Sequence, residues 1–235
     1  MIRSAIIMGW VVLATAFFAP LAIIASFFTR TGNPVHLIAR IWGQSILWVS
    51  RVHVSVKGLS NIELDKSYVY MANHQSNFDI PVLLGCLPVQ FRWLAKAELF
   101  KIPLFGRAML GAGYVKIDRF NRKSAFESLE EAARRMRNGV SVMIFPEGTR
   151  SKDGSIRQFK KGGFVMAIKS GVAIVPVVLR GTWPIMAKGS LRINRGDVEM
   201  EIGEPIDTSG FSLETKEELM ETVRTVICQK FENTY

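Results

Sequence analysis

The sequence contains little cysteine, with only Cys86 and Cys228 among its 235 residues. Two cysteines in apolar, helix-like surroundings provide no disulfide framework, so the composition fits a reducing compartment. The sequence also lacks a G-x-S-x-G motif, which excludes the nucleophile elbow of serine hydrolases. It contains no internal repeat, no low-complexity tract and no cluster of candidate metal ligands.

Acidic residues are scarce relative to basic ones: 20 Asp and Glu stand against 30 Lys and Arg, a formal net charge of +10. Nucleic-acid binding is compatible with that charge, but the basic residues are scattered and no nucleic-acid module is recognisable. Anionic lipid headgroups, an acidic protein partner and phosphate-bearing substrates explain the charge better.

Charge is absent altogether from residues 4–29, which are almost wholly apolar and bracketed by Arg3 and Arg30. About 20 apolar residues suffice to cross the hydrocarbon core of a bilayer, so we interpret this stretch as an uncleaved membrane anchor. Pro20 interrupts it, and a kinked helix or a re-entrant pair of half-helices is equally compatible with the sequence. The segment Ala14-Thr15-Ala16 imitates a signal-peptidase site, but the apolar run continues well beyond it. A buried structural helix is the alternative.

Residues 36–50 show a second helical pattern with two tryptophans, which suit a headgroup interface. Such a helix could lie in one leaflet beside the first segment, or span with it. We therefore expect a two-helix membrane anchor over residues 1–50 and an α/β domain over residues 51–235.

The rest of the sequence alternates between strand-like runs and amphipathic helices, which predicts an α/β fold with a central, mostly parallel sheet flanked by helices. Two of the runs, 68–72 and 140–145, are mostly apolar with little polar alternation, as in strands buried on both faces. Polar residues follow each run. If both strands run parallel in one sheet, the polar residues share the rim where ligands of such sheets bind.

The first polar motif contains His74 and, five positions later, Asp79. Histidine is well suited to proton transfer near neutral pH, and a short loop could fold Asp79 back onto the imidazole to orient it. Both residues also have ordinary interpretations. A single histidine near a strand end is commonly a hydrogen-bonded structural residue, and Asp79 could simply cap a helix that has Pro81 in its first turn.

The second polar motif contains Glu147, Gly148, Thr149 and Arg150. Arginine together with backbone amides near a glycine suits an anionic group such as phosphate, and the Glu and Thr side chains could bind hydroxyls. The alternative is an ordinary turn followed by a solvated basic surface.

These motifs together resemble the glycerolipid acyltransferase family. The pattern N-H-x-x-x-x-D begins at Asn73 and F-P-E-G-T-R-S begins at Phe145. Two further blocks of the family occur in order, one over 96–106 continuing to 113–119 and the other over 174–179. The resemblance covers roughly residues 52–208, and within the family it is strongest to bacterial enzymes that make phosphatidic acid.

The resemblance implies the glycerolipid acyltransferase fold, with His74 as general base and Asp79 as the residue that orients it. It assigns binding of the glycerol phosphate portion of the acceptor to Glu147, Gly148, Thr149 and Arg150, with Arg119 and Lys101 as helpers. The implied reaction transfers a fatty acyl group from an acyl carrier protein or coenzyme A thioester to the sn-2 hydroxyl of 1-acyl-sn-glycerol 3-phosphate (lysophosphatidic acid). No cofactor or metal is implied. The implied location is the cytoplasmic face of the bacterial plasma membrane.

Several alternatives remain open at this level. Another lysolipid could be the acceptor, or the protein could be a membrane lipid-binding protein without catalysis. Backbone amides near Gly148 or in the His74 loop are candidates for stabilising the oxyanion. An acyl groove and ordinary core packing both fit a set of apolar residues: Leu99, Phe100, Ile102, Leu104, Phe105 and Met109.

Overall fold

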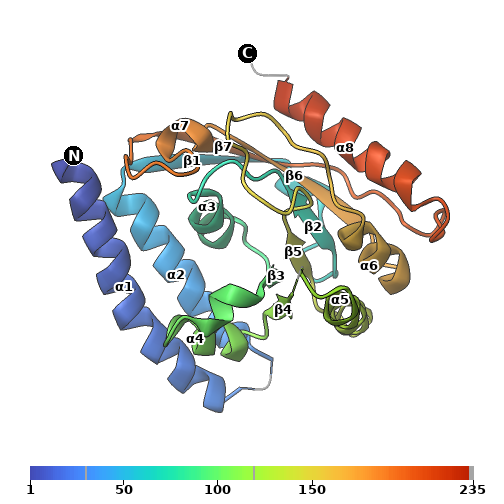
Figure 1. Ribbon diagram of the computed structural model, residues 1–235, viewed down its shortest axis with the longest axis horizontal. Helices are drawn as coiled ribbons and strands as arrows, with labels where there is room; N and C mark the ends of the chain where they lie inside the picture. Colours follow the sequence, from blue (N-terminus) through green and yellow to red (C-terminus); the bar gives the residue numbers. More distant parts are fainter. Residues whose placement is uncertain (30, 119, 233–235) are drawn as a thin grey trace.

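A seven-stranded sheet forms the centre of the computed structural model, which describes residues 1–29, 31–118 and 120–232 (Figure 1). The strand order is β1-β7-β6-β2-β5-β3-β4. Strands β2 to β6 run parallel to one another, whereas β7 is antiparallel to β6 and parallel to β1. The predicted α/β fold with a mostly parallel sheet is therefore confirmed. The strands are β1 (Val52–Lys57), β2 (Val69–Ala72), β3 (Arg92–Lys96), β4 (Val115–Ile117), β5 (Val142–Ile144), β6 (Ile174–Arg180) and β7 (Gly196–Ile202).

Helices cover both faces of this sheet. The chain enters through α1 and α2, and most later helices alternate with strands, as expected for an α/β domain (Figure 1). They are α1 (Ile2–Phe27), α2 (Asn33–Val49), α3 (Asp79–Cys86), α4 (Phe105–Gly111), α5 (Arg122–Arg137), α6 (Gly162–Ser170), α7 (Thr182–Ile185) and α8 (Lys216–Glu232). Two short 3₁₀ helices, η1 (Leu59–Asn61) and η2 (Ala97–Lys101), complete the description.

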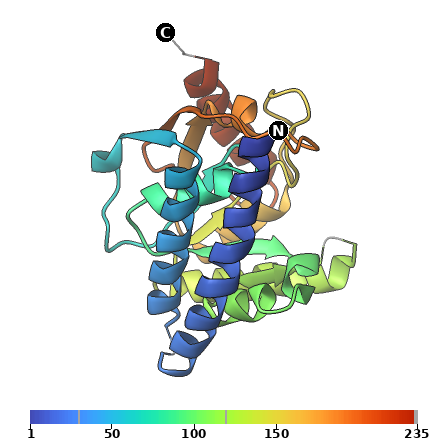
Figure 2. The same cartoon turned by 90° about the vertical axis from the view of Figure 1, so that its left-hand side faces the viewer.

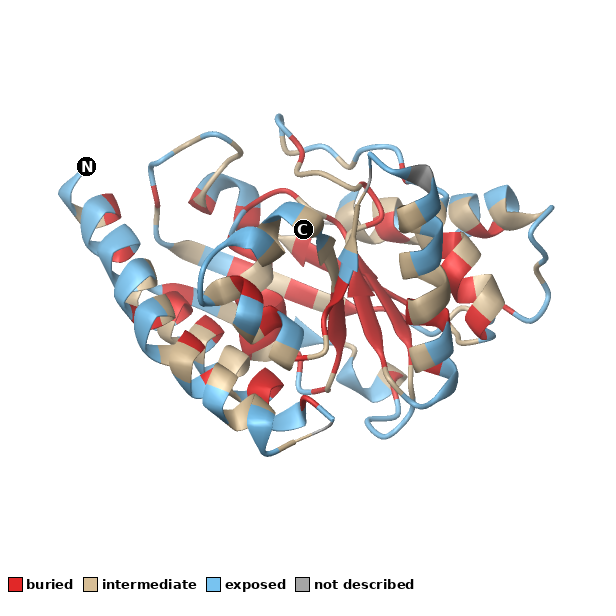
Figure 3. Ribbon diagram, turned by 60° about the horizontal axis from the view of Figure 1, so that its bottom comes forward, coloured by how far each residue is buried: buried red, intermediate tan, exposed pale blue. Residues whose placement is uncertain are grey.

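Strand β2 shows how the two faces are built. Its residues are all buried, and alternate side chains enter different cores. Val69 and Met71 pack with α5, α6 and α8, whereas Tyr70 and Ala72 pack on the side of α1 to α4. The central strands β2, β5 and β6 are accordingly buried on both faces (Figure 3), which explains why their sequences lack polar alternation.

Helices α1 and α2 form an antiparallel hairpin along one side of the protein (Figure 2). The helix α1 continues through Pro20, and Gly32 makes the turn into α2 with a φ of +72°. Its inner face packs on α2 and α4 through residues such as Ile7 and Ala22, while its outer face exposes large apolar side chains such as Phe17. Within α1 an 18-residue window has a mean hydropathy of 2.3, so by length and composition this helix could cross a membrane.

One strand differs from the sequence-based expectation. Pro176 argues for an edge or a bulge, yet β6 lies in the interior of the sheet between β7 and β2. The carbonyl of Pro176 accepts a hydrogen bond from Gly203, one residue beyond β7, and the ladder between β6 and β7 begins only at Val177. The N–H that proline lacks would point to the same side as this carbonyl, beyond the end of the ladder, so an interior proline is tolerated there.

Candidate active site

His74 and Asp79 meet at the carboxyl end of β2. The Nδ1 atom of His74 lies 2.7 Å from Oδ2 of Asp79, which is fully buried in the first turn of α3. The same carboxylate oxygen accepts the backbone amides of Gln75 at 2.7 Å and Ser76 at 2.8 Å. A six-residue connection thus folds Asp79 back onto the imidazole, which is the geometry expected for a base and its orienting carboxylate.

The ring of His74 is held from another side by Phe145. The two rings stack with their centroids 3.7 Å apart and their planes 7° from parallel. Because the carboxylate engages Nδ1, the nitrogen left to accept a proton from a substrate is Nε2. Strand β5, which delivers Phe145, pairs directly with β2, so the two polar motifs do share one rim of the sheet.

Glu147 takes a different position from the one that the family resemblance implies. Its Oε1 accepts a hydrogen bond from the amide of His74 at 2.7 Å, and its Oε2 accepts one from the amide of Arg157 at 2.9 Å. Only 1% of the residue is exposed. Both carboxylate oxygens therefore accept hydrogen bonds from backbone amides. The bond to the amide of His74 fixes the loop that carries the imidazole. Burial raises the pKa of Glu147 to about 7, and the two amides oppose that shift.

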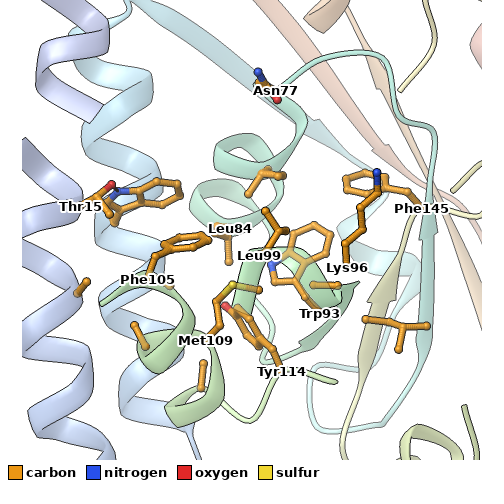
Figure 4. A pocket seen from close by; sticks show the side chains of 18 of the residues that line it. Thr15, Asn77, Leu84, Trp93, Lys96, Leu99, Phe105, Met109, Tyr114 and Phe145 are labelled. Atoms are coloured by element: carbon orange, nitrogen blue, oxygen red, sulfur yellow. Dashed lines mark hydrogen bonds between the residues drawn. The ribbon is translucent and has the colours of Figure 1, made fainter. Parts of the chain in front are cut away.

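A cavity of about 370 Å³ extends from His74 toward the helical hairpin (Figure 4). Trp93, Tyr114 and Met109 line its middle. Ala22 of α1 and Val35 of α2 also belong to the lining. Its volume is in the range of ligand sites in proteins. Three of the six predicted groove residues, Leu99, Phe105 and Met109, line it; the other three, Phe100, Ile102 and Leu104, do not, and the last two are about half exposed.

The other end of the cavity is cationic. Gly148, Thr149 and Arg150 of the second motif line it next to His74, as do Lys96 and Lys188. Lys96 opens the second block of the family resemblance, but sequence reasoning selected Lys101, which is exposed at the end of η2 and does not contribute to the lining. Arg119 lies outside the described residues, so its role stays a prediction. Lys188 lies beyond all four blocks, and no motif in the sequence indicates it.

Most amides proposed for the oxyanion are already engaged. The amide of His74 donates to Glu147, those of Gln75 and Ser76 donate to Asp79, and that of Gly148 donates to the carbonyl of Phe145 at 3.0 Å. These four groups are not available to an oxyanion in this conformation. For a metal, residues 1–29, 31–118 and 120–232 contain no group of three or more His, Cys, Asp or Glu side chains placed to share an ion.

Comparison with known proteins identifies the same region. A sequence model of the acyltransferase family matches residues 53–180. The 1-acyl-sn-glycerol-3-phosphate acyltransferase LPAT1 of Arabidopsis thaliana chloroplasts is 42% identical over 74% of this chain, which covers 49% of that protein. The chain thus spans about half the length of this chloroplast relative. The 1-acyl-sn-glycerol-3-phosphate acyltransferase of Borreliella burgdorferi is 32% identical over 79% of this chain and 74% of its own length.

A solved structure agrees with these sequence matches. The crystal structure of the 1-acyl-sn-glycerophosphate acyltransferase PlsC from Thermotoga maritima superposes with a TM-score of 0.82 at 32% identity, covering 97% of this chain and 95% of that one. The fold thus agrees with the resemblance found in the sequence. The chain belongs to the acyltransferase family.

Proposed function

We propose that this protein transfers a fatty acyl group from a thioester of acyl carrier protein or coenzyme A to the sn-2 hydroxyl of 1-acyl-sn-glycerol 3-phosphate. The product is phosphatidic acid. The observation that carries the proposal is the position of His74, which is paired with Asp79 and lines a cavity that is cationic beside it and apolar beyond. An acceptor with a phosphate near its hydroxyl, and a donor with a long acyl chain, match the two ends.

In the proposed reaction, Nε2 of His74 removes the proton from the acceptor hydroxyl as its oxygen attacks the thioester carbonyl. A new ester C–O bond forms and a tetrahedral intermediate carries the negative charge on the former carbonyl oxygen. The C–S bond then breaks, and the leaving thiolate takes the proton back from the imidazolium of His74. Asp79 keeps Nδ1 protonated and stabilises that imidazolium throughout. No covalent intermediate with the protein is needed.

The substrate contacts follow from the lining. Arg150, with Gly148 and Thr149, is proposed to bind the glycerol phosphate portion, since guanidinium groups pair well with phosphate. Glu147 contributes by holding the His74 loop rather than by touching the acceptor. The apolar portion from Trp93 to Ala22 is proposed to hold the acyl chain.

The proposed location is the cytoplasmic face of a bacterial plasma membrane, where both thioester donors are made. The apolar outer face of α1 supports membrane association, because large side chains such as Leu13 and Phe17 are more than half exposed in the protein alone. An enzyme seated at the bilayer surface would receive and release its lipids without moving them through water.

Acceptor-dependent thiol release tests the proposal. Detergent-solubilised protein is given acyl-coenzyme A or acyl carrier protein thioester, with and without lysophosphatidic acid. We expect release that depends on the acceptor and that falls by roughly 10²–10⁴-fold in His74→Ala. His53→Ala, on the exposed edge strand β1, is the matched control and should keep full activity.

Other outcomes discriminate among the alternatives. Thiol release with a different lysolipid, but none with lysophosphatidic acid, would move the protein to another acceptor within the same family. Silence with every lysolipid and both donors would favour a lipid-binding protein without catalysis.

A further inference from the structure

Lys188 lines the cationic end of the cavity from outside the four motif blocks and outside the family match at 53–180. We propose that Lys188 is a phosphate-binding residue that completes the substrate anion site with Arg150. This inference rests on the proposed function, because it assigns a phosphate of one of the two substrates to that end of the cavity.

The position of Lys188 is fixed by the loop that carries His74. Ser76 forms an isolated antiparallel bridge with Ala187, and its hydroxyl donates to the carbonyl of Met186 at 2.9 Å. The segment 186–188 is therefore attached to the same short loop that places the imidazole beside Asp79. Because of this attachment, the chain delivers the ammonium of Lys188 to the site with little freedom.

The ammonium group is aimed at the second motif. Its Nζ donates to Oγ1 of Thr149 at 3.1 Å and to the carbonyl of Arg150 at 3.2 Å. An ammonium has three donors, and these two bonds leave a third for a ligand. The hydroxyl of Thr149 thus accepts a hydrogen bond from Lys188. The sequence alone predicts instead that Thr149 binds a substrate hydroxyl.

The described residues around Lys188 are mostly positively charged. Among the residues that the structure describes, no carboxylate forms an ion pair with any member of this cationic group, which consists of Lys96, Arg150, Lys152, Arg157 and Lys188. Cations gathered in this way repel one another unless an anion joins them. By contrast, Arg180 forms ion pairs with Glu199 and Glu201, so other cations of this protein do have carboxylate partners.

The titration behaviour of Lys188 is consistent with an incomplete anion site. Loss of hydration lowers the pKa of its ammonium group, and the positive charges of Arg157, Lys152, Arg150 and Lys96 lower it further. A bound phosphate would supply negative charge at the point where these cations converge and would favour the charged form of Lys188.

A purely structural role for Lys188 is the competing explanation. In that case the lysine would only fasten segment 186–190 to the second motif through Thr149 and Arg150. The two explanations differ in one respect. If Lys188 only fastens the segment, its substitution should change the affinity for all ligands of the cavity alike. If Lys188 binds phosphate, its substitution should change the affinity only for ligands that carry phosphate.

Calorimetric titration in detergent micelles distinguishes them with two matched pairs of ligands. The first pair is 1-oleoylglycerol 3-phosphate and 1-oleoylglycerol, which tests the acceptor as the source of the phosphate. The second pair is coenzyme A and pantetheine, which tests the donor. The proteins are wild type, Lys188→Met, Lys188→Arg and the control Lys66→Met, which changes an exposed lysine just before the amino end of β2.

We expect Lys188→Met to weaken binding of the phosphate-bearing member of one pair by roughly 10- to 100-fold, the usual value of a charge-assisted hydrogen bond. Its phosphate-free partner should bind as it does to wild type. The pair that shows the difference identifies the source of the phosphate. Lys188→Arg should recover most of the affinity, because it keeps the charge, and Lys66→Met should behave as wild type.

Equal weakening of both members of each pair, or no weakening at all, would overturn the inference. Because binding is measured without turnover, the result is separate from the proposed function. If wild type binds 1-oleoylglycerol 3-phosphate but transfers no acyl group to it, the proposed reaction fails while Lys188 is still tested as a phosphate ligand. If Lys188→Met does not fold, Lys188→Gln and the charge-preserving arginine variant provide the same comparison.

Discussion

The Nδ1 atom of His74 lies 2.7 Å from Oδ2 of Asp79 because α3 begins at Asp79 and turns its first residue back toward the end of β2. This one oxygen accepts three hydrogen bonds, from the imidazole of His74 and from the amides of Gln75 and Ser76. Orientation of the base and the shape of the loop that carries it are therefore set by the same atom.

Asp79→Asn should separate activity from binding. An asparagine whose oxygen replaces Oδ2 still accepts hydrogen bonds from Nδ1 of His74 and from the amides of Gln75 and Ser76, but it carries no negative charge to stabilise the imidazolium. We expect kcat to fall by roughly 10²–10⁴-fold, with the KM for the acceptor little changed. Steady-state kinetics check this, with Asp65→Asn in an exposed loop as control. A variant that kept half of the wild-type rate would contradict the role of Asp79.

Glu147→Gln should change how stability depends on pH. The pKa of Glu147 rises from 4.5 to about 7 because the carboxyl is buried. A carboxyl with a raised pKa binds its proton more tightly in the folded state, so its contribution to stability is greatest below the unfolded pKa and is lost as pH rises through the folded pKa. Wild type should therefore lose free energy of unfolding relative to Glu147→Gln between about pH 4.5 and 7.

Urea unfolding at a series of pH values measures that difference. The rise of the pKa from 4.5 to about 7 limits this difference to about 3 kcal/mol, since each pKa unit corresponds to about 1.4 kcal/mol. Glutamine can accept only one of the two amides of His74 and Arg157, which lowers the stability of the variant by an amount that does not vary with pH. Parallel curves for the two proteins would show that folding does not raise the pKa of Glu147.

If the proposed acyl transfer is correct, Ala108→Leu should shift the preferred acyl donors toward shorter chains. Ala108 on α4 lines the apolar part of the cavity, so a larger side chain removes space there. Each methylene that no longer fits should lower kcat/KM by about 10-fold or more. A series of acyl-coenzyme A donors from short to long measures this, with Leu110→Phe on the same helix as control, because Leu110 is 59% exposed. An unchanged chain-length profile would remove this cavity as the acyl site.

Charges on the outer face of α1 should release the protein from membranes. Leu13 and Phe17 are 66% and 62% exposed, and each aspartate placed in apolar surroundings costs about 2.5–3.5 kcal/mol at the centre of a bilayer. We expect the double variant Leu13→Asp with Phe17→Asp to lose most of its co-flotation with phospholipid vesicles. Leu213→Asp, before α8, serves as control and should float as wild type does. Full flotation of the double variant would show that another surface binds the membrane.

Much of the fold could be predicted because local sequence and burial agree. The apolar runs before His74 and Glu147 are adjacent parallel strands, and Asn138 and Gly139 do follow the last residue of α5. The interior position of Pro176 could not be predicted, because it depends on where the partner strand β7 stops, which is a property of the pairing and not of β6 itself.

The candidate site could be predicted where a motif places its residues close in sequence, as with His74 and Asp79. It could not be predicted where chemistry depends on contacts between distant segments. The sequence suggests that Glu147 is a ligand for hydroxyls, but 73 residues separate it from the amide that it accepts. Lys188 could not be predicted for the same reason, since contacts of Ser76 with Met186 and Ala187, far away in the sequence, bring it to the second motif.

Helix α1 has one exposed apolar face and one face that lines the cavity. One exposes Leu13 and Phe17, while the other places Thr15, Phe18 and Ala22 in the cavity lining. A fusion in which an unrelated membrane-spanning helix replaces α1 would therefore remain attached to vesicles but would have an open cavity. In this protein α1 is not an interchangeable module, because removing it also removes a wall of the cavity beside His74.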